Sequence, residues 1–322
     1  MNILVTGGAG YIGSHACKLL AAEGHVPVTY DNLSRGHRAA VKWGPLEVGD
    51  LEDRPKLRAV FEQYRPAALM HFAAFAYVGE SVEQPELYNR NNVLGSQALF
   101  ETLIEHRPLP VIFSSSCVTY GVPDTIPITE NHPQRPINPY GETKLKVEHM
   151  LADAGRLHGV PWVTLRYFNA AGSDPDGEIG EDHNPETHLI PLVLMAARDN
   201  TPVKILGDDY NTPDGTCVRD YVHVVDIADA HVRALDYLFT GGASCALNLA
   251  NSRGHSVKEV IATAEQVCRR TIAVENAPRR PGDPPILVGS AERAREVLGW
   301  IPSRADLQIQ VSDAWNWFRS RG

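Results

Sequence analysis

Short apolar runs alternate along the first half of the chain with segments whose apolar residues recur at helical spacing. The run at 3–6 ends in glycines, and 12–22 then places its apolar side chains on one helical face. A second apolar run, 26–30, ends at Asp31. The first thirty residues therefore predict a strand–helix–strand unit.

The same alternation continues through the first half of the chain. Further strands are expected at 68–72, 111–114 and 162–166, and further helices at 57–64, 92–105 and 143–158. Strands that alternate with helices favour an open, mostly parallel sheet with helices on both faces. The predicted fold class is therefore α/β, a doubly wound sheet of the Rossmann type.

After residue 169 the texture of the sequence changes. Residues 172–188 are rich in Gly, Asp, Pro and Glu and predict an insertion loop, whereas 222–238 predicts a helix with Asp226 as its N-cap. The other expected elements are helices at 188–198, 256–269 and 306–319, strands at 203–206 and 246–250, and a proline-rich loop at 278–285. This mixture is typical of a second lobe assembled from several excursions.

Length and composition bound the possibilities. The 322 residues, 43% of them hydrophobic, suffice for two domains. We expect an NAD-binding domain over 1–168 with a return segment near 219–252, and a smaller, discontinuous, interwoven substrate domain over 169–322.

The net charge of −9, without runs of like charge, gives no sign of nucleic-acid binding. The chain starts on a strand-like apolar run rather than an export signal, no run reaches membrane-spanning length, and five dispersed cysteines indicate free thiols in the cytoplasm.

The glycines at 7–13 form the first candidate site. Their GxxGxxG spacing lies between the first strand and the first helix, where backbone N–H groups can approach a pyrophosphate. Asp31, 18 residues past this segment, can accept hydrogen bonds from ribose hydroxyls, which favours NAD over NADP. Arg35 and Arg38 leave a 2′-phosphate possible. Asp50 is either a turn residue or an acceptor for the adenine amino group.

Tyr140 and Lys144 form the second candidate site. At i and i+4 they share one face of the helix expected here. A cation within about 4–6 Å of a phenol favours the phenolate, so we expect Lys144 to lower the pKa of Tyr140 and prepare it as a general base. Ser116 follows the strand at 111–114 and can hydrogen-bond a substrate oxygen beside the tyrosine.

Four possible metal ligands lie close together in the insertion loop. They are Glu181, Asp182, His183 and His188. Their spacing matches no zinc template. We therefore expect no metal here and a polar loop that covers the substrate.

Eight motifs occur in an order that resembles a known superfamily. They are 7–13, 31–33, 71–74, 78–81, 114–116, 140–144, 166–169 and 218–221. Together they resemble the extended short-chain dehydrogenase/reductase superfamily and, within it, the enzymes that epimerise UDP-sugars at C4. The resemblance covers essentially the whole chain.

The resemblance implies an isomerase of galactose metabolism that interconverts UDP-glucose and UDP-galactose by transient oxidation at C4. Tyr140 would act as the general base, Lys144 would hold the nicotinamide ribose, and Ser116 would orient the 4-oxygen. The hydride would pass to NAD and return to the opposite face of the 4-keto sugar. The family also implies a homodimer, with helices 92–105 and 143–158 pairing across a two-fold axis.

The remaining site residues follow from the same resemblance. The cofactor-binding positions are Gly7, Gly10, Tyr11, Ile12, Gly13, Asp31, Asn32, Asp50, Leu51, Phe72, Ala73, Ala74, Asn91, Ser114, Tyr140, Lys144 and Tyr167. The substrate-binding positions are Ser116, Tyr140, Asn169, His188, Leu189, Arg219, Arg280, Asp283 and Leu287. The two arginines make chemical sense because guanidinium groups pair with diphosphate oxygens.

The chain departs from the family pattern in four places, one of which is Cys117-Val118-Thr119, where the usual small-residue run after the serine is reshuffled. His188 stands where some members carry asparagine, so contact with uracil or diphosphate can differ, and Ala76 replaces a lysine near the cofactor. Leu287 occupies a position that limits pocket size, and it is smaller than the tyrosine associated with excluding N-acetyl sugars. Epimerisation of UDP-GlcNAc and UDP-GalNAc is therefore an open alternative.

Other members of the superfamily offer further alternatives. A sugar 4,6-dehydratase needs an acidic pair after the serine, and Cys117-Val118 holds none. An epimerase of UDP-arabinose and UDP-xylose stays open because 74–78 and 214–218 resemble such enzymes. A non-catalytic NAD-sensing regulator can dispense with the tyrosine, so the presence of Tyr140 argues against it.

Overall fold

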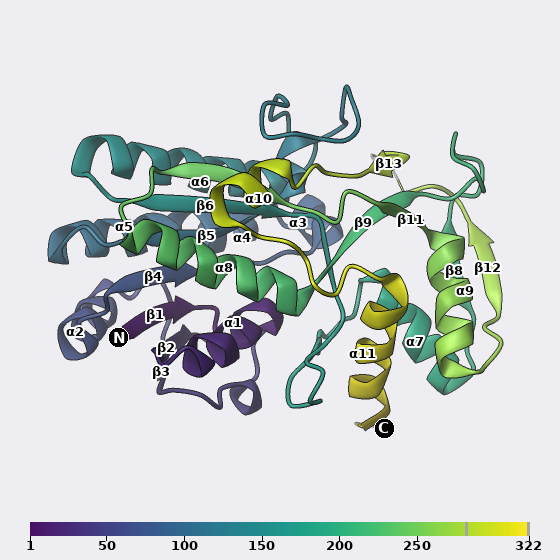
Figure 1. Cartoon of the computed structure of the whole chain (residues 1–322), viewed down its shortest axis with the longest axis horizontal. Helices are drawn as coiled ribbons and strands as arrows, with labels where there is room; N and C mark the ends of the chain where they lie inside the picture. Colours follow the sequence, from purple (N-terminus) through teal and green to yellow (C-terminus); the bar gives the residue numbers. More distant parts are fainter. Residues whose placement is uncertain (281–282, 321–322) are drawn as a thin grey trace.

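The computed structural model describes residues 1–280 and 283–320, and its centre is a seven-stranded parallel sheet (Figure 1). The strands are β1 (Asn2–Thr6), β2 (Val26–Asp31), β3 (Leu46–Val48), β4 (Ala68–His71), β5 (Val111–Ser116), β6 (Trp162–Tyr167) and β10 (Cys245–Leu249). Their spatial order is β10-β6-β5-β4-β1-β2-β3. The predicted doubly wound α/β fold is confirmed. The order reverses between β1 and β4, where such sheets bind ligands.

Helices cover both faces of this sheet. One face carries α1 (Tyr11–Ala22), α8 (Val224–Phe239) and α10 (Glu292–Leu298), and the other carries α2 (Arg54–Tyr64), α5 (Gly95–His106) and α6 (Pro139–His158). In β1, Ile3 and Val5 join the first core, whereas Leu4 joins the second. Successive strand residues point to opposite faces, and both faces are buried, so the strand reads as an unbroken apolar run.

The chain leaves the sheet after β6 and returns to it as α8 and β10. Cys245 of β10 pairs with Val163 of β6 at the sheet edge. The predicted N-cap of α8 was wrong, because the strand β9 (Val218–His223) runs directly into the helix and the His223 ring accepts from the Val225 N–H. Asp226 instead accepts hydrogen bonds from the backbone N–H groups of residues 303 and 304, and so ties α8 to the C-terminal segment.

A smaller lobe lies beside the carboxyl ends of the strands (Figure 1, right). It contains β7 (Asn169–Ala171), β9, β11 (Gly254–Ser256) and β13 (Ile286–Leu287) in one sheet, and β8 (Val203–Leu206) with β12 (Val274–Ala277) in another. Its helices α7 (Leu189–Asp199), α9 (Val257–Cys268) and α11 (Leu307–Ser320) share one apolar core. Part of the expected 278–285 loop, residues 281–282, lies outside the described residues.

Two helix boundaries differ from expectation in ways that matter for the site. Helix α6 begins at Pro139 because the Asn138 side chain accepts from the Gly141 N–H at 2.8 Å, so Tyr140 lies in its first turn. The helix expected at 92–105 is preceded by α3 (Val78–Glu83), α4 (Pro85–Tyr88) and a π-helical turn (Asn89–Leu94).

The short elements complete the chain. They are the 3₁₀ turns η1 (Arg38–Ala40) and η3 (Cys117–Tyr120). Among residues 1–280 and 283–320, no helix has the length and apolar character needed to cross a membrane. All five cysteines are free, as expected.

Candidate active site

One large cavity opens between the carboxyl ends of the parallel strands and the smaller lobe. Its volume is about 1110 Å³. Every residue predicted to bind cofactor or substrate lines it, from Gly7 at one end to Leu287 at the other. The sequence motifs, although scattered over the chain, therefore converge on a single site.

The glycine turn lies at the floor of this cavity. Gly7 has φ +72°, and a Cβ atom there would lie 2.5 Å from the backbone nitrogen of Ala73. A Cβ on Gly13 would lie 2.3 Å from the Gly7 carbonyl oxygen. Helix α1 starts after Gly10, and no side chain caps its first N–H groups. Such an uncapped helix end behind a close-packed turn fits the pyrophosphate of a dinucleotide.

Asp31 is held rigidly at the end of β2. Its two carboxylate oxygens accept from the backbone N–H groups of Ala9 at 3.1 Å and Leu33 at 2.8 Å. Burial raises the pKa of Asp31 despite these bonds. The neighbouring Asn32 donates to the carboxylate of Asp50 at 3.0 Å, which links Asp50 to the end of β2 beside Asp31.

Arg35 lies in the same part of the cavity but is already paired. It donates to the carboxylate of Glu80 at 2.6 Å, and its guanidinium lies over the rings of Phe75 and Tyr77. Because Glu80 neutralises this cation, Arg35 is poorly suited to hold a 2′-phosphate. The site therefore fits NAD better than NADP.

Tyr140, Lys144 and Ser116 meet where β5 ends. Lys144 donates to the backbone carbonyl oxygen of Ser114 at 2.8 Å, and its Nζ lies 5.9 Å from the centre of the Tyr140 ring. Ser116 is the last residue of β5, and its hydroxyl oxygen accepts from the Val118 N–H at 3.4 Å. The i, i+4 geometry predicted for the tyrosine and lysine is present on α6.

Burial dominates the electrostatics of this pair. Burial raises the pKa of Tyr140 well above its ordinary value, the neighbouring Tyr167 phenol adds to the rise, and a hydrogen bond with Ser116 opposes it. Burial also lowers the pKa of Lys144 to about 7. The lowered phenol pKa expected from the sequence is therefore absent here, because burial is the largest influence on both groups.

A buried ion pair behind α6 escaped the sequence analysis. Glu148, one helical turn beyond Lys144, accepts from Arg166 of β6 through both carboxylate oxygens, at 2.6 to 3.2 Å. Its charge favours the protonated form of Lys144, although less strongly than burial opposes it. The i, i+4 spacing from Lys144 was the signal that could have identified Glu148.

The smaller lobe contributes two arginines that share one carboxylate. Arg280 donates to both oxygens of Asp283 at 2.9 and 3.1 Å, and Arg219 lies 3.4 Å from the same group. Nearby, Leu287 packs against a small apolar cluster that includes Cys117. The cations predicted to bind a diphosphate are therefore adjacent, and Asp283 holds them together.

His188, at the start of α7, also lines the cavity and is paired with Glu181 through Nδ1. Glu186 and His183 complete this cluster, whereas Asp182 lies toward His37 instead. Burial alone would raise the pKa of Glu181, but the two histidines hold it at about 2. Burial likewise opposes the charge on His183, but the carboxylates raise its pKa to about 10.

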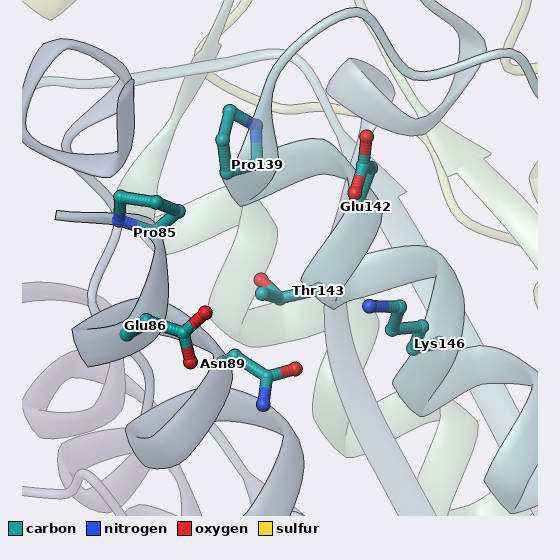
Figure 2. Close-up of a pocket in the computed structure, with 7 residues that line it drawn as sticks. All are labelled: Pro85, Glu86, Asn89, Pro139, Glu142, Thr143 and Lys146. Carbon is teal, nitrogen blue, oxygen red and sulfur yellow. The ribbon is translucent and has the colours of Figure 1, made fainter. Parts of the chain in front are cut away.

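A second, smaller hollow lies on the outer side of α6, away from the large cavity. Figure 2 shows Glu142 and Lys146 of α6 facing Glu86 and Asn89 across it. Tyr140 and Lys144 line the large cavity instead. One helix therefore carries the candidate catalytic pair on one face and a hollowed polar surface on another.

Comparisons with known proteins identify the family of this chain. The model of the NAD dependent epimerase/dehydratase family matches residues 3–250. A UDP-glucose 4-epimerase of Rhizobium meliloti (strain 1021) is 52% identical over 321 residues, which cover 99% of this chain and 98% of that protein.

Two crystal structures are also similar over nearly their whole length. UDP-glucose 4-epimerase from Brucella ovis in complex with NAD has a TM-score of 0.95 and 51% identity, covering 98% of this chain and 97% of that one. UDP-glucose-4-epimerase from Stenotrophomonas maltophila, with bound NAD and formylated UDP-arabinopyranose, has a TM-score of 0.95 and 39% identity, covering 100% and 98%.

The chain belongs to the NAD dependent epimerase/dehydratase family. Within that family it is an isomerase of the epimerase type, and NAD is its cofactor. The resemblance inferred from the ordered motifs is thereby confirmed, and so is the predicted preference for NAD.

Proposed function

We propose that this enzyme interconverts UDP-glucose and UDP-galactose by transient oxidation at C4 of the sugar. The observation that carries the proposal is the meeting of Tyr140, Lys144 and Ser116 beside the glycine turn, at the carboxyl edge of the sheet. The full-length identity to UDP-glucose 4-epimerases supports the same reaction.

The protein's own part in the reaction is to hold and move one proton. Tyr140 takes the proton of the 4-hydroxyl when C4 is oxidised to a ketone, and returns it when that ketone is reduced. When bound, NAD would supply the hydride acceptor. Burial raises the phenol pKa, and in its protonated form Lys144 opposes that rise, because a cationic neighbour favours the phenolate. Ser116 hydrogen-bonds the reacting oxygen.

The substrate's nucleotide end meets the smaller lobe. We assign Arg219 and Arg280 to the diphosphate, because guanidinium groups form paired, charge-assisted hydrogen bonds with phosphate oxygens. Both arginines are paired with Asp283 in the structure, so diphosphate binding exchanges one anionic partner for another. Asn169, Leu189 and the remaining predicted substrate residues complete the wall of the cavity.

Two other sugars compete with hexoses for this site. Leu287 leaves more room than a tyrosine would, which favours some turnover of UDP-N-acetylhexosamines. The segments 74–78 and 214–218 resemble pentose epimerases. The curated relatives are UDP-glucose 4-epimerases, so the hexose is the preferred substrate in this proposal.

We also propose a cytoplasmic homodimer. The α5–α6 face is the pairing surface that the family implies, and it adjoins exposed Leu87 and Leu94 and the hollow in Figure 2. The five free cysteines suit a reducing compartment. Light scattering should give twice the 35.4 kDa chain mass, and a single-chain mass in solution would reject the dimer.

The direct experiment is incubation of the purified protein with UDP-galactose, followed by chromatographic analysis of the nucleotide sugars. Formation of UDP-glucose until the two sugars reach equilibrium supports the proposal. A parallel sample without added NAD tests whether cofactor remains bound through purification. No UDP-glucose in either sample would reject the assignment.

A further inference from the structure

The end of the 172–188 loop brings two carboxylates and two imidazoles together at the edge of the cavity. One donor atom from each of Glu181, His183, Glu186 and His188 lies within 4.8 Å of the others. The two glutamate side chains are almost fully buried, with 3% and 5% exposure, and that of His183 is 20% exposed. The His188 side chain is more open, with 41% exposure. A largely buried group of mixed N and O donors still differs from the acidic clusters common on protein surfaces.

The separations between these atoms suit a single small cation. His183 Nδ1 lies 3.1 Å from Glu181 Oε1 and 3.8 Å from Glu186 Oε2, and His188 Nδ1 lies 3.6 Å from Glu186 Oε1. Zinc–ligand distances of about 2.0–2.2 Å in a tetrahedron place neighbouring donors about 3.3–3.6 Å apart. These three separations are close to that range, whereas His188 Nδ1 and Glu181 Oε1 are hydrogen-bonded directly and must move apart for a cation to enter.

The His183 ring provides an independent indication. Its Nδ1 atom is buried and has no hydrogen-bond partner. The ring is flanked edge-on by Tyr11 and Tyr77, with centroids 6.2 and 5.6 Å away, which fix its orientation. A buried nitrogen that faces two carboxylates at 3.1 and 3.8 Å pairs with them as an imidazolium, and once deprotonated it can coordinate a cation held between them.

Charge balance sets the condition for binding. In the metal-free protein the two carboxylates favour protonated His183 and His188, so a cation must displace these protons. The two carboxylates and two neutral imidazoles then carry a charge of −2, which one divalent cation neutralises. Mixed imidazole and carboxylate donors suit Zn²⁺ and similar transition metals, whereas Mg²⁺ and Ca²⁺ prefer oxygen ligands alone. Four protein ligands leave no open position, which is typical of a structural rather than a catalytic zinc site.

We infer that Glu181, His183, Glu186 and His188 form a binding site for one Zn²⁺-like cation. Its effect is to fasten the end of the 172–188 loop to the start of α7, because His188 is the residue before that helix. The cation thereby fixes one wall of the cavity. This inference departs from the expectation of no metal. The four residues grouped from the sequence included Asp182, whereas the structure brings Glu186 into the group.

The test is equilibrium dialysis of the full-length protein, free of any histidine tag and stripped with a chelator, against Zn²⁺, followed by metal analysis. We expect one Zn²⁺ per chain. In His183→Gln and Glu186→Gln, the affinity should fall by about 100-fold or more, since even residues that only support metal ligands contribute 10–100-fold. His158→Gln, an exposed histidine at the end of α6 and outside both acidic groups, is the matched control and should bind as the wild type does.

Two further measurements keep the result decisive. If circular dichroism shows that His183→Gln is unfolded, the more exposed His188→Gln replaces it. Substitution with Co²⁺ should give the intense visible absorption of a tetrahedral site. No uptake by the stripped wild type, equal uptake by the ligand variants, or an octahedral Co²⁺ spectrum would each overturn the inference. None of these readouts depends on epimerase activity.

Discussion

The two sides of the cavity hold their polar groups by different means. On the sheet side, backbone groups fix the chemistry: Asp31 accepts from two backbone N–H groups, and Lys144 donates to a backbone carbonyl. On the lobe side, charged side chains hold one another, as in the pairing of Arg219 and Arg280 with Asp283. The sheet side is preorganised, whereas the lobe side must exchange partners when a charged ligand binds.

This difference matches the demands of the proposed reaction. Proton and hydride transfer require atoms held within a fraction of an ångström, which a backbone-anchored site provides. Between oxidation and reduction the 4-keto sugar must rotate, so that its opposite face receives the hydride. The groups that hold the substrate must therefore allow it to move. We therefore expect substitutions on the sheet side to affect the chemical step and those on the lobe side to affect binding.

Removal of the Tyr140 hydroxyl should have the largest effect. In Tyr140→Phe we expect the turnover number for UDP-galactose to fall by about 10²–10⁴-fold, the usual contribution of a general base. Bound NAD should be retained, as measured by its release on denaturation. Tyr237→Phe, outside the cavity, is the matched control. Unchanged turnover in Tyr140→Phe would show that another group is the base.

Lys144 should carry a cost in stability that depends on pH. Its pKa is about 7 in the folded protein and about 10.5 when unfolded, so the unfolded chain binds the extra proton between these values. Stability therefore rises as the pH increases through this window. We expect Lys144→Met to be more stable than the wild type at pH 7 by up to about 4 kcal/mol, less the cost of leaving the Ser114 carbonyl without its donor.

Urea unfolding of both proteins measures this difference. The gap should shrink as the pH rises to 10.5, where the lysine is neutral in the folded protein and half protonated in the unfolded chain. Lys146→Met, an exchange on the outer face of the same helix, controls for changes in helix propensity. A gap between wild type and Lys144→Met that is the same at pH 7 and pH 10 would show that Lys144 is not titrating as described.

On the lobe side, Arg219→Met should weaken binding more than chemistry. Charge-assisted hydrogen bonds contribute about 1.5–3 kcal/mol, so KM for UDP-galactose should rise by about 10- to 100-fold. The turnover number should change much less. Steady-state kinetics separate the two parameters, and Arg198→Met, which removes a surface pair with Asp199, is the control. A fall in kcat with KM unchanged would contradict the division between the two sides.

The smallest expected effect concerns the apolar wall. Leu287→Tyr should lower the ratio of kcat/KM for UDP-GlcNAc to that for UDP-galactose by about tenfold, because a filled hydrophobic pocket discriminates by only a few kcal/mol. The comparison requires both substrates with wild type and variant. If the wild type does not turn over UDP-GlcNAc, Leu287 does not make the pocket large enough for an N-acetyl sugar, and the prediction is wrong.

The sequence predicted the sheet side better than the lobe side for a physical reason. The glycine turn, Asp31, and the Tyr140–Lys144 pair depend on local spacing, which fixes their geometry within one strand, turn or helix. The shared carboxylate of Asp283 depends on segments more than 60 residues apart, which no local pattern reveals.

The errors have equally specific causes. Asp226 was predicted as an N-cap because its residue type suits that position, but strand β9 continues to His223, whose ring caps the helix instead. The pKa of Tyr140 was predicted from its distance to Lys144, but burial in the folded protein outweighs that attraction. Burial and long-range pairing arise only after folding, so sequence spacing does not encode them directly.

In the proposed reaction, a hydride leaves C4 of the sugar and later returns to the same carbon. UDP-galactose deuterated at C4 tests this step. After reaction in ordinary water, mass spectrometry of the UDP-glucose product gives the deuterium content at C4. The account predicts complete retention, since the hydride never exchanges with solvent. Loss of deuterium to water would contradict reversible oxidation at this carbon.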